Sequence, residues 1–397
     1  MASKIFMGDM PELMENILNN LKNEFYSLYS CALVNRHWCL YFSEYVDFKT
    51  EVLHSLERNV LFLSQIQDLS LSSISGYSFE SATKLLKILA KSFPKINTLE
   101  FNDFYSDYKP QIYHALICII KSHDQLRRFN LTGTSFKFPA NFHGIISALK
   151  NQNQSLREVI IQNCTCSAEF KVLMKCENLE ILRIRNCNNV ELLTLSYCKI
   201  NTLEIVDSPI NGSNMSLIFE KSGSFLQQLK LGAKNKMIIE DSSLLALKSF
   251  CPKITYLNLS YIEFSTQLLD LIGNLKNLQF LTLGYLYIIN NDIIVEDQVR
   301  LFAEILPSTL QYLDLRYTFL NSFIVSLLNN CYAPLKKLLI NRLNDEKQIK
   351  ALIEFSLRNR SLNYVGINRY SSLGNNIQSQ IKEYVKLVPY ERIVVDC

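Results

Sequence analysis

Cysteine and histidine are the side chains most suited to bind metal ions, and this chain of 397 residues has eleven and five of them. The two cysteines closest in sequence are Cys164 and Cys166. A zinc site usually takes four such ligands, commonly as two pairs. No second pair stands at zinc spacing, so Cys164 and Cys166 are interpreted first as buried thiols, with metal ligation as the weaker alternative. The histidines do not pair at metal or catalytic-triad spacing: His37, His54, His114, His123 and His143.

Adjacent carboxylates could serve as an acid and a base. Glu240 with Asp241, and Asp345 with Glu346, both fall in polar stretches where a solvated surface is the simpler explanation. The sequence also lacks the glycine-rich phosphate loops, the G-x-S-x-G elbow and the H-E-x-x-H zinc motif. We therefore expect a protein that is not an enzyme and needs no cofactor or metal.

The elements that organise the chain repeat the pattern L-x-x-L-x-L, with other apolar residues allowed at the apolar places. Most matches start 23 to 32 residues apart, close to the period of leucine-rich repeats, whereas two in the middle start only 11 and 10 residues apart. Thirteen matches occur: Ile66/Leu69/Leu71, Ile96/Leu99/Phe101, Leu126/Phe129/Leu131, Leu156/Val159/Ile161, Leu179/Leu182/Ile184, Val190/Leu193/Leu195, Ile200/Leu203/Ile205, Leu226/Leu229/Leu231, Ile254/Leu257/Leu259, Leu278/Leu281/Leu283, Leu310/Leu313/Leu315, Leu335/Leu338/Ile340 and Leu362/Val365/Ile367.

The second and third apolar residues of each match lie two apart, so both point to one side of a short strand and the residue between them faces solvent. Amphipathic stretches return the chain as helices, at 81–92, 111–122, 243–250 and 297–306. The predicted fold is α/β, a leucine-rich-repeat solenoid with parallel strands on the concave face and helices on the convex face. Three strands joined by tight turns are expected from 179 to 205, because the short spacings leave no room for helices.

Two residue types support this register. Prolines stop helices, and Pro94, Pro252, Pro307 and Pro334 each stand one to three residues before the first apolar place of a repeat. The ninth place of the repeat is often Asn or Cys, and it holds the buried thiols expected at Cys164, Cys187 and Cys198.

Charge and hydropathy exclude several classes of partner. The formal net charge is +4 and no block of like charges occurs, which argues against nucleic acid or a membrane surface as the main partner. The longest apolar run, near 117–120, is too short to span a bilayer, and the first residues do not resemble a signal peptide. We expect a soluble protein of the cytoplasm or nucleus with reduced cysteines.

The residues before the repeats form a distinct pattern. An apolar face at i+4 spacing follows Pro11, and a second apolar segment ends at the sole tryptophan, Trp38. The order of residues resembles the F-box, whose pattern runs Leu-Pro-x-Glu-(Ile/Leu), then an Ile-Leu pair, then Cys-x-x-Val-(Cys/Asn)-(Lys/Arg)-x-Trp. The matching residues are Pro11, Glu12, Leu13, Ile17, Leu21, Leu28, Cys31, Val34, Asn35, Arg36 and Trp38.

The resemblance implies an all-α module over residues 1–60 that docks on the Skp-type adaptor of an SCF ubiquitin ligase and, through it, on cullin. The leucine-rich repeats of residues 61–397 would then choose an unknown target protein, an architecture similar to the large fungal F-box families. The adaptor-binding residues so implied are Pro11, Leu13, Ile17, Leu21, Leu28, Val34 and Trp38. Two alternatives stay open: a hydrophobic cap for the solenoid end, and an interaction scaffold with a vestigial F-box.

The repeat register also predicts a partner-binding surface. The residue before the second apolar place forms one row, hereafter the first row: Tyr256, Phe280, Tyr312 and, later, Tyr364. The residue two after the third apolar place forms the second row: Tyr261, Tyr285, Tyr317, Arg342 and Arg369. Aromatic residues on neighbouring strands would make an apolar strip for a partner. The alternative is that the rings pack against one another or under loops.

Overall fold

The computed structural model describes residues 67–72, 79–92, 96–104, 110–123, 125–133, 143–190, 199–232, 239–288, 295–343, 345–368 and 381–395. The F-box-like residues, from Pro11 to Trp38, and the predicted domain boundary after residue 60 lie outside these residues. The chain divides into two units, Met1–Leu193 and Thr194–Cys397. This division falls within the repeats and leaves the predicted boundary untested.

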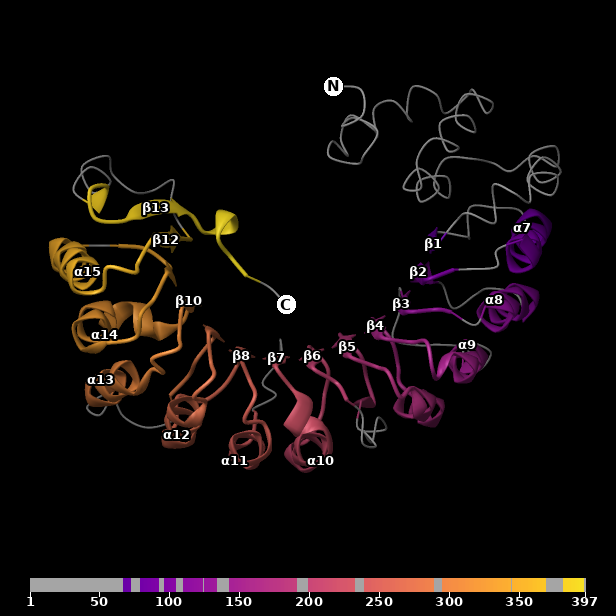
Figure 1. Ribbon diagram of the computed structural model, residues 1–397, viewed down its shortest axis with the longest axis horizontal. Coiled ribbons are helices and arrows are strands. Elements are labelled where there is room, and N and C mark those ends of the chain that lie inside the picture. Colours follow the sequence, from indigo (N-terminus) through magenta and orange to yellow (C-terminus); the bar gives the residue numbers. More distant parts are fainter. Residues whose placement is uncertain are drawn as a thin grey trace, which may run out of the picture. The chain divides into compact units, whose positions relative to one another are not determined.

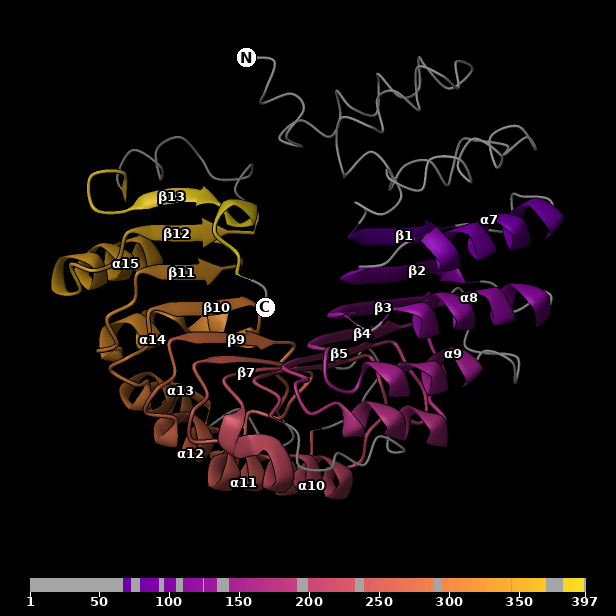
Figure 2. The ribbon, with the colours of Figure 1, turned by 45° about the vertical axis from the view of Figure 1, so that its right-hand side comes forward.

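The described residues of the first unit form five parallel strands in sequence order, with helical connections that return outside the sheet. These strands are β1 (Asp68–Ser72), β2 (Thr98–Phe104), β3 (Arg128–Gly133), β4 (Glu158–Gln162) and β5 (Ile181–Arg185). The connections hold helices α7 (Phe79–Ser92), α8 (Pro110–Ser122) and α9 (His143–Ala148), then the 3-10 helices Leu149–Gln152 and Ala168–Lys175. Figure 2 shows the strands of this unit side by side with its helices along one face.

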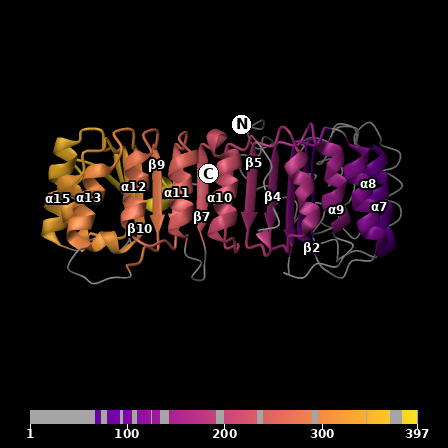
Figure 3. The ribbon, with the colours of Figure 1, turned by 90° about the horizontal axis from the view of Figure 1, so that it is seen from below.

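Where the structure describes it, the second unit continues the same plan with eight parallel strands. They are β6 (Thr202–Val206), β7 (Gln228–Gly232), β8 (Tyr256–Ser260), β9 (Phe280–Gly284), β10 (Tyr312–Tyr317), β11 (Lys337–Ile340), β12 (Tyr364–Ile367) and β13 (Lys386–Pro389). Its helices are α10 (Gly212–Ser222), α11 (Asp241–Phe250), α12 (Thr266–Asn274), α13 (Val295–Ile305), α14 (Ile324–Asn330) and α15 (Glu346–Arg358). Within this unit the strands line the inner side and the helices the outer side (Figure 1), and Figure 3 shows those helices in a row.

The core lies between the strands and the helices, and the leucine pattern explains it. In β8, Leu257 and Leu259 are fully buried, and Leu281 and Leu283 hold the same places on β9. Apolar faces of the helices close the core from outside, for example Leu268, Leu269, Leu271 and Ile272 of α12. Each repeat therefore buries its leucines against its neighbours, and the fold is an α/β leucine-rich-repeat solenoid.

The predicted register is confirmed wherever the structure describes it. Twelve of the thirteen matches fall on strands, while the match at 190–195 lies largely outside the described residues. The four helices predicted at 81–92, 111–122, 243–250 and 297–306 are α7, α8, α11 and α13. Helices α11, α13 and α14 end two to four residues before Pro252, Pro307 and Pro334, as expected of residues that cannot continue a helix.

Two structural predictions were incomplete or wrong. Strand β13 was missed because its sequence, Lys-Leu-Val-Pro, lacks the spaced leucines of the other repeats. The residue between the paired apolar places was expected to face solvent, yet Glu204, Asp314 and Leu339 there are at most 2% exposed. Ion pairs cover the two acids, and the end of the chain covers Leu339.

Candidate partner-binding surface

Three tyrosines of the second row form a continuous stack at the ends of strands β8, β9 and β10. The ring centroids of Tyr261 and Tyr285 lie 4.5 Å apart with planes 12° from parallel, and those of Tyr285 and Tyr317 lie 5.5 Å apart at 7°. Tyr285 is 49% exposed and Tyr317 is 43% exposed. We call these three residues the tyrosine stack. Two of its rings are exposed, as predicted for the second row, while all three also pack against one another, as the alternative had it.

The backbone under the stack is unusual. Tyr261 and Tyr285 have φ angles of 60° and 51°, in the left-handed region. This conformation lets the backbone N–H of Tyr261 donate to the carbonyl oxygen of Gly284, and that of Tyr285 to the carbonyl oxygen of Tyr317, at 2.9 and 2.8 Å. The chain thus bonds to the next repeat beyond the regular end of its strand.

Other repeats have asparagine or aspartate at the equivalent position of the turn. Asn163, Asn186 and Asp207 occupy the equivalent place with φ between 52° and 55°, and Asn and Asp adopt this conformation far more readily than tyrosine does. Tyr261 and Tyr285, at this position in two consecutive repeats, therefore have a strained backbone conformation that asparagine would relieve. Strain of this kind is concentrated at functional sites, so these positions are candidates for binding.

The first row was expected to be exposed, and for two of its members that prediction is wrong. Tyr256 is 3% exposed and Tyr312 is 1% exposed, and Phe280 and Tyr364 are half-buried. Tilted ring contacts join Tyr256, Phe280 and Tyr312, with centroids 6.3 and 5.8 Å apart. Packing of the rings against one another, the alternative that the sequence left open, therefore accounts for much of this row.

The cover over the first row is the end of the chain itself, residues 390–395, which we call the C-terminal tail. From β13 the tail turns back along the inner side of its unit (yellow in Figure 1). The backbone N–H of Val395 donates to the hydroxyl of Tyr312 at 3.2 Å, and the hydroxyl of Tyr256 donates to the carbonyl oxygen of Val395 at 3.5 Å. Ile393 packs in one cluster with Tyr312, Leu339 and Val388.

A glycine makes room for this tail. Gly366 occupies the inner-facing place of β12, and a Cβ there would lie 3.0 Å from Cδ1 of Ile393 and 3.1 Å from Cγ of Leu339. Any larger residue would therefore push Ile393 away from the sheet. The missing side chain at this position of β12 therefore leaves the space that Ile393 occupies.

A buried ion pair connects the tail with the tyrosine stack. The guanidinium of Arg316 binds the carboxylate of Asp314 in bidentate fashion, with Nε at 2.9 Å from Oδ1 and Nη2 at 2.7 Å from Oδ2. The same guanidinium lies 4.2 Å from the ring centroid of Tyr390 and 5.3 Å from that of Tyr317. Burial, and then the charge of Asp314, raise the pKa of the Tyr312 hydroxyl well above its usual range. Stack, ion pair and tail thus form one contact network.

The basic end of the second row is only partly described. Arg342 is exposed just after β11, whereas Arg369 lies outside the described residues. The partner-binding role of either row remains a prediction. No signal in the repeat pattern could have revealed the tail residues, because they contact strands far away in sequence.

The cysteines proposed at the ninth place of the repeat are buried where they are described. Cys164 and Cys187 are fully buried and Cys166 is 1% exposed, while Cys198 lies outside the described residues. The Cys164 thiol lies 3.0 Å from the carbonyl oxygen of Gln162, and burial raises its pKa. Within the described ranges no three His, Cys, Asp or Glu side chains are grouped so as to hold a metal ion.

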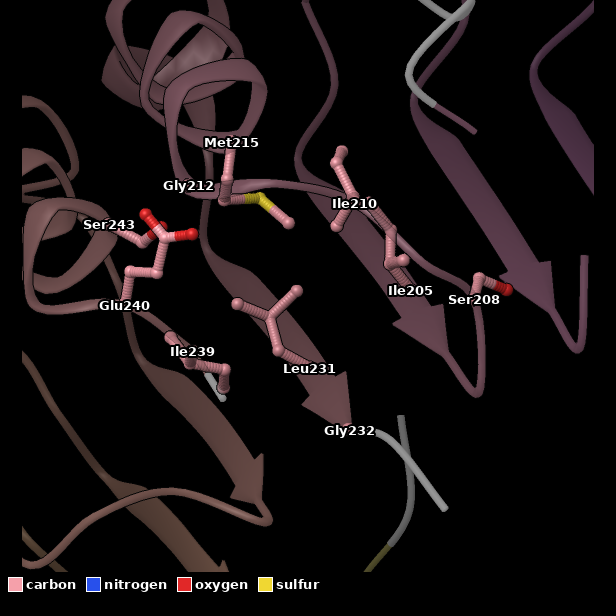
Figure 4. Close-up of a pocket in the computed structure, with 10 residues that line it drawn as sticks. All are labelled: Ile205, Ser208, Ile210, Gly212, Met215, Leu231, Gly232, Ile239, Glu240 and Ser243. Atoms are coloured by element: carbon pink, nitrogen blue, oxygen red, sulfur yellow. The ribbon is translucent and has the colours of Figure 1, made fainter. Parts of the chain in front are cut away.

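A small pocket opens in the second unit between α10, the start of α11 and the ends of β6 and β7 (Figure 4). Aliphatic side chains and Met215 make up half of its ten lining residues, and the others include two serines and Glu240. Ser242 donates a hydrogen bond to Glu240 at 3.3 Å. Among the described residues that line the pocket, Glu240 is the charged one. No helix in the described parts of the chain is long and apolar enough to cross a membrane.

Comparisons with known proteins add likeness of fold. No family model matches the chain, and no curated protein matches it significantly. Among solved structures, a chain of the yeast Rad7–Elc1 complex is 14% identical, covers 98% of this chain and 97% of its own, and gives a TM-score of 0.43. A leucine-rich-repeat protein of Leptospira interrogans is also 14% identical, covers 87% and 88%, and gives 0.40. At these values neither likeness carries an argument about function.

Proposed function

We propose that this chain is the substrate-recognition subunit of an SCF-type ubiquitin ligase. The F-box-like residues around Leu13 would bind the Skp-type adaptor, which binds cullin, and the repeats would bind the target protein. The chain itself would carry no catalytic step. It would act by raising the effective concentration of the target near the ubiquitin-conjugating enzyme.

The tyrosine stack is the observation that carries the target-binding half of the proposal. Exposed aromatic rings offer large contact areas at a small entropic cost, which is why they are enriched in binding hot spots. The rings of Tyr285 and Tyr317 stack on each other, and the Arg316 guanidinium lies over the Tyr317 ring, before any partner arrives. A preorganised surface of this kind loses little freedom on binding. The adaptor-binding half rests on the F-box resemblance.

Two variants test the two halves separately. The adaptor would be co-expressed with the full chain, and target proteins would be identified by affinity capture. Leu13→Asp should abolish capture of the adaptor and increase recovery of targets, because they would no longer be ubiquitinated. Tyr285→Ala with Tyr317→Ala should retain the adaptor and lose the targets.

The matched control replaces Leu245 and Leu301 by alanine, since they are 52% and 46% exposed on helices α11 and α13. Adaptor capture that is absent from the intact protein, or unaffected by Leu13→Asp, would favour the scaffold with a vestigial F-box. Equal target loss in the control and the tyrosine variant would exclude the stack as the binding surface.

A further inference from the structure

Charges on the strand faces of this protein are mostly neutralised by neighbours. The carboxylate of Glu158 on β4 binds Nε of Arg128 at 2.6 Å and also binds Arg183 on β5. Glu204, 1% exposed on β6, lies 3.3 Å from Nζ of Lys230 on β7. Basic side chains in these strands are thus already paired inside the protein.

Strands β11 to β13 depart from this rule. Strand pairing aligns Lys337, Tyr364 and Lys386 side by side as the first residues of the three strands. Among the described residues, no carboxylate lies within 4.0 Å of either lysine ammonium group, although Nζ of Lys386 lies 5.6 Å from the ring centroid of Tyr364. Asp314 is the acid on the inner face of the adjoining strand, and Arg316 already neutralises it.

We propose that Lys337, Tyr364 and Lys386 bind an acidic segment of the partner protein in an extended conformation. This inference rests on the proposed function, because it names the chemistry of the partner that the inner face would take. The unpaired positive charge calls for carboxylates, and the Tyr364 ring between the lysines offers an apolar surface to the aliphatic part of a glutamate side chain that reaches them.

The spacing suits an extended chain. Neighbouring strands lie about 4.8 Å apart, so the lysine backbones, two strands apart, are separated by roughly 10 Å. Alternate side chains of an extended peptide are about 7 Å apart on one face, and the flexible lysine stems can cover the difference. Two carboxylates at alternate positions would therefore reach both ammonium groups, and the intervening residue would point away from the sheet.

A nucleic acid is the main competing partner for a basic and aromatic surface. Its affinity comes from many phosphate contacts, commonly along a continuous basic groove. Here the two lysines are followed toward β8 by Tyr312, Phe280 and Tyr256, which carry no positive charge. The short basic surface favours a peptide, and an oligonucleotide serves as a test arm.

The test measures fluorescence anisotropy of labelled synthetic peptides with the full chain. One dodecapeptide alternates glutamate and phenylalanine, and the second alternates lysine and phenylalanine. The glutamate peptide should bind, and its affinity should fall at least about tenfold in Lys337→Glu with Lys386→Glu and also at high salt. The control variant, Lys150→Glu with Lys175→Glu, makes the same charge change at exposed residues of two 3-10 helices in the first unit and should bind like the native chain.

Three results would overturn the inference: no binding of the glutamate peptide, an equal loss in the control variant, or tighter binding of a single-stranded oligonucleotide. Failure of the inference and failure of the proposed function remain distinguishable. If the double lysine variant still captures the targets that the tyrosine variant loses, the stack binds partners and the acidic chemistry is wrong. If neither variant loses targets, the proposed surface itself is wrong.

Discussion

A tyrosine with left-handed backbone angles loses backbone stability but gains stability from ring stacking. The second unit has such a tyrosine at the same turn of two consecutive repeats. At Tyr285 the ring stacks on Tyr261 and on Tyr317, which offsets strain that asparagine avoids at the same place in other repeats. Stacked aromatic pairs contribute about 0.5–1.5 kcal/mol each, and left-handed backbone costs a non-glycine residue about 1–2 kcal/mol. The two effects are of similar size, so stability alone gives little reason for tyrosine here.

The substitution Tyr285→Asn tests this balance. We expect it to change the free energy of unfolding by less than about 1 kcal/mol, because relief of strain compensates for lost stacking. Urea denaturation measures the change. Leu283→Ala, two residues earlier in the buried core, is the comparison and should cost about 2–5 kcal/mol. A loss as large for Tyr285→Asn would mean that the stack is mainly structural.

The buried thiol of Cys251 makes a separate prediction about pH. Burial raises its pKa from 9.0 to about 12, so the folded chain keeps the proton where the unfolded chain releases it. The contribution of this thiol to the free energy of unfolding is therefore fully present below about pH 9 and is lost as the pH rises toward 12. Replacing this cysteine by alanine should reduce the dependence of the unfolding free energy on pH, between pH 9 and 11, by about one proton. The same slope in native and variant chains would contradict the assignment.

At the scale of elements, the tail and the strands that it covers form one packed unit. Gly366 of β12 leaves room for Ile393, and the tail in turn removes Tyr312 from solvent. The tail therefore acts as an internal cover for the first row and leaves the tyrosine stack as the exposed aromatic surface of these strands.

A second-site suppressor tests this fit. Gly366→Ala should destabilise the chain by about 1–3 kcal/mol, as overpacking usually does, and should lower the pKa of Tyr312 by loosening its cover. Ile393→Val removes the Cδ1 atom that the new methyl group would meet, so adding it should restore part of the lost stability. Ultraviolet titration of tyrosine and urea denaturation measure the two effects. Additive losses in the double variant would show that the two residues do not share this contact.

At the scale of the whole molecule, the predictable features are the local ones. Each strand is specified by leucines a few residues apart and each helix end by a nearby proline, so the register could be read along the chain. The tail could not be predicted in this way. Val395 bonds to Tyr312 and Tyr256, 83 and 139 residues earlier, and no short-range pattern records such contacts.

For the candidate surface, the positions of its residues could be predicted from the sequence, but their exposure could not. The second row follows from the repeat register alone, and its tyrosines lie on neighbouring strands as predicted, but the register did not predict that their rings stack on one another. The exposure of the first row depended on what lies above the sheet, which the register does not contain. The tail's cover removes Tyr256 and Tyr312 from the predicted strip. The tyrosine stack and Arg342 stay accessible, and Phe280 and Tyr364 stay half-buried.

The central claim, that the tyrosine stack contacts the target, is tested most directly by site-specific photocrosslinking in cells. A benzophenone amino acid would replace Tyr285 in one version of the full chain and Leu245, equally exposed on α11, in the other. We predict that the crosslinker at 285, and not at 245, captures a discrete protein whose yield rises when Leu13→Asp is added. Crosslinks that are identical at both positions, or absent at 285 while the target still co-purifies, would contradict the claim.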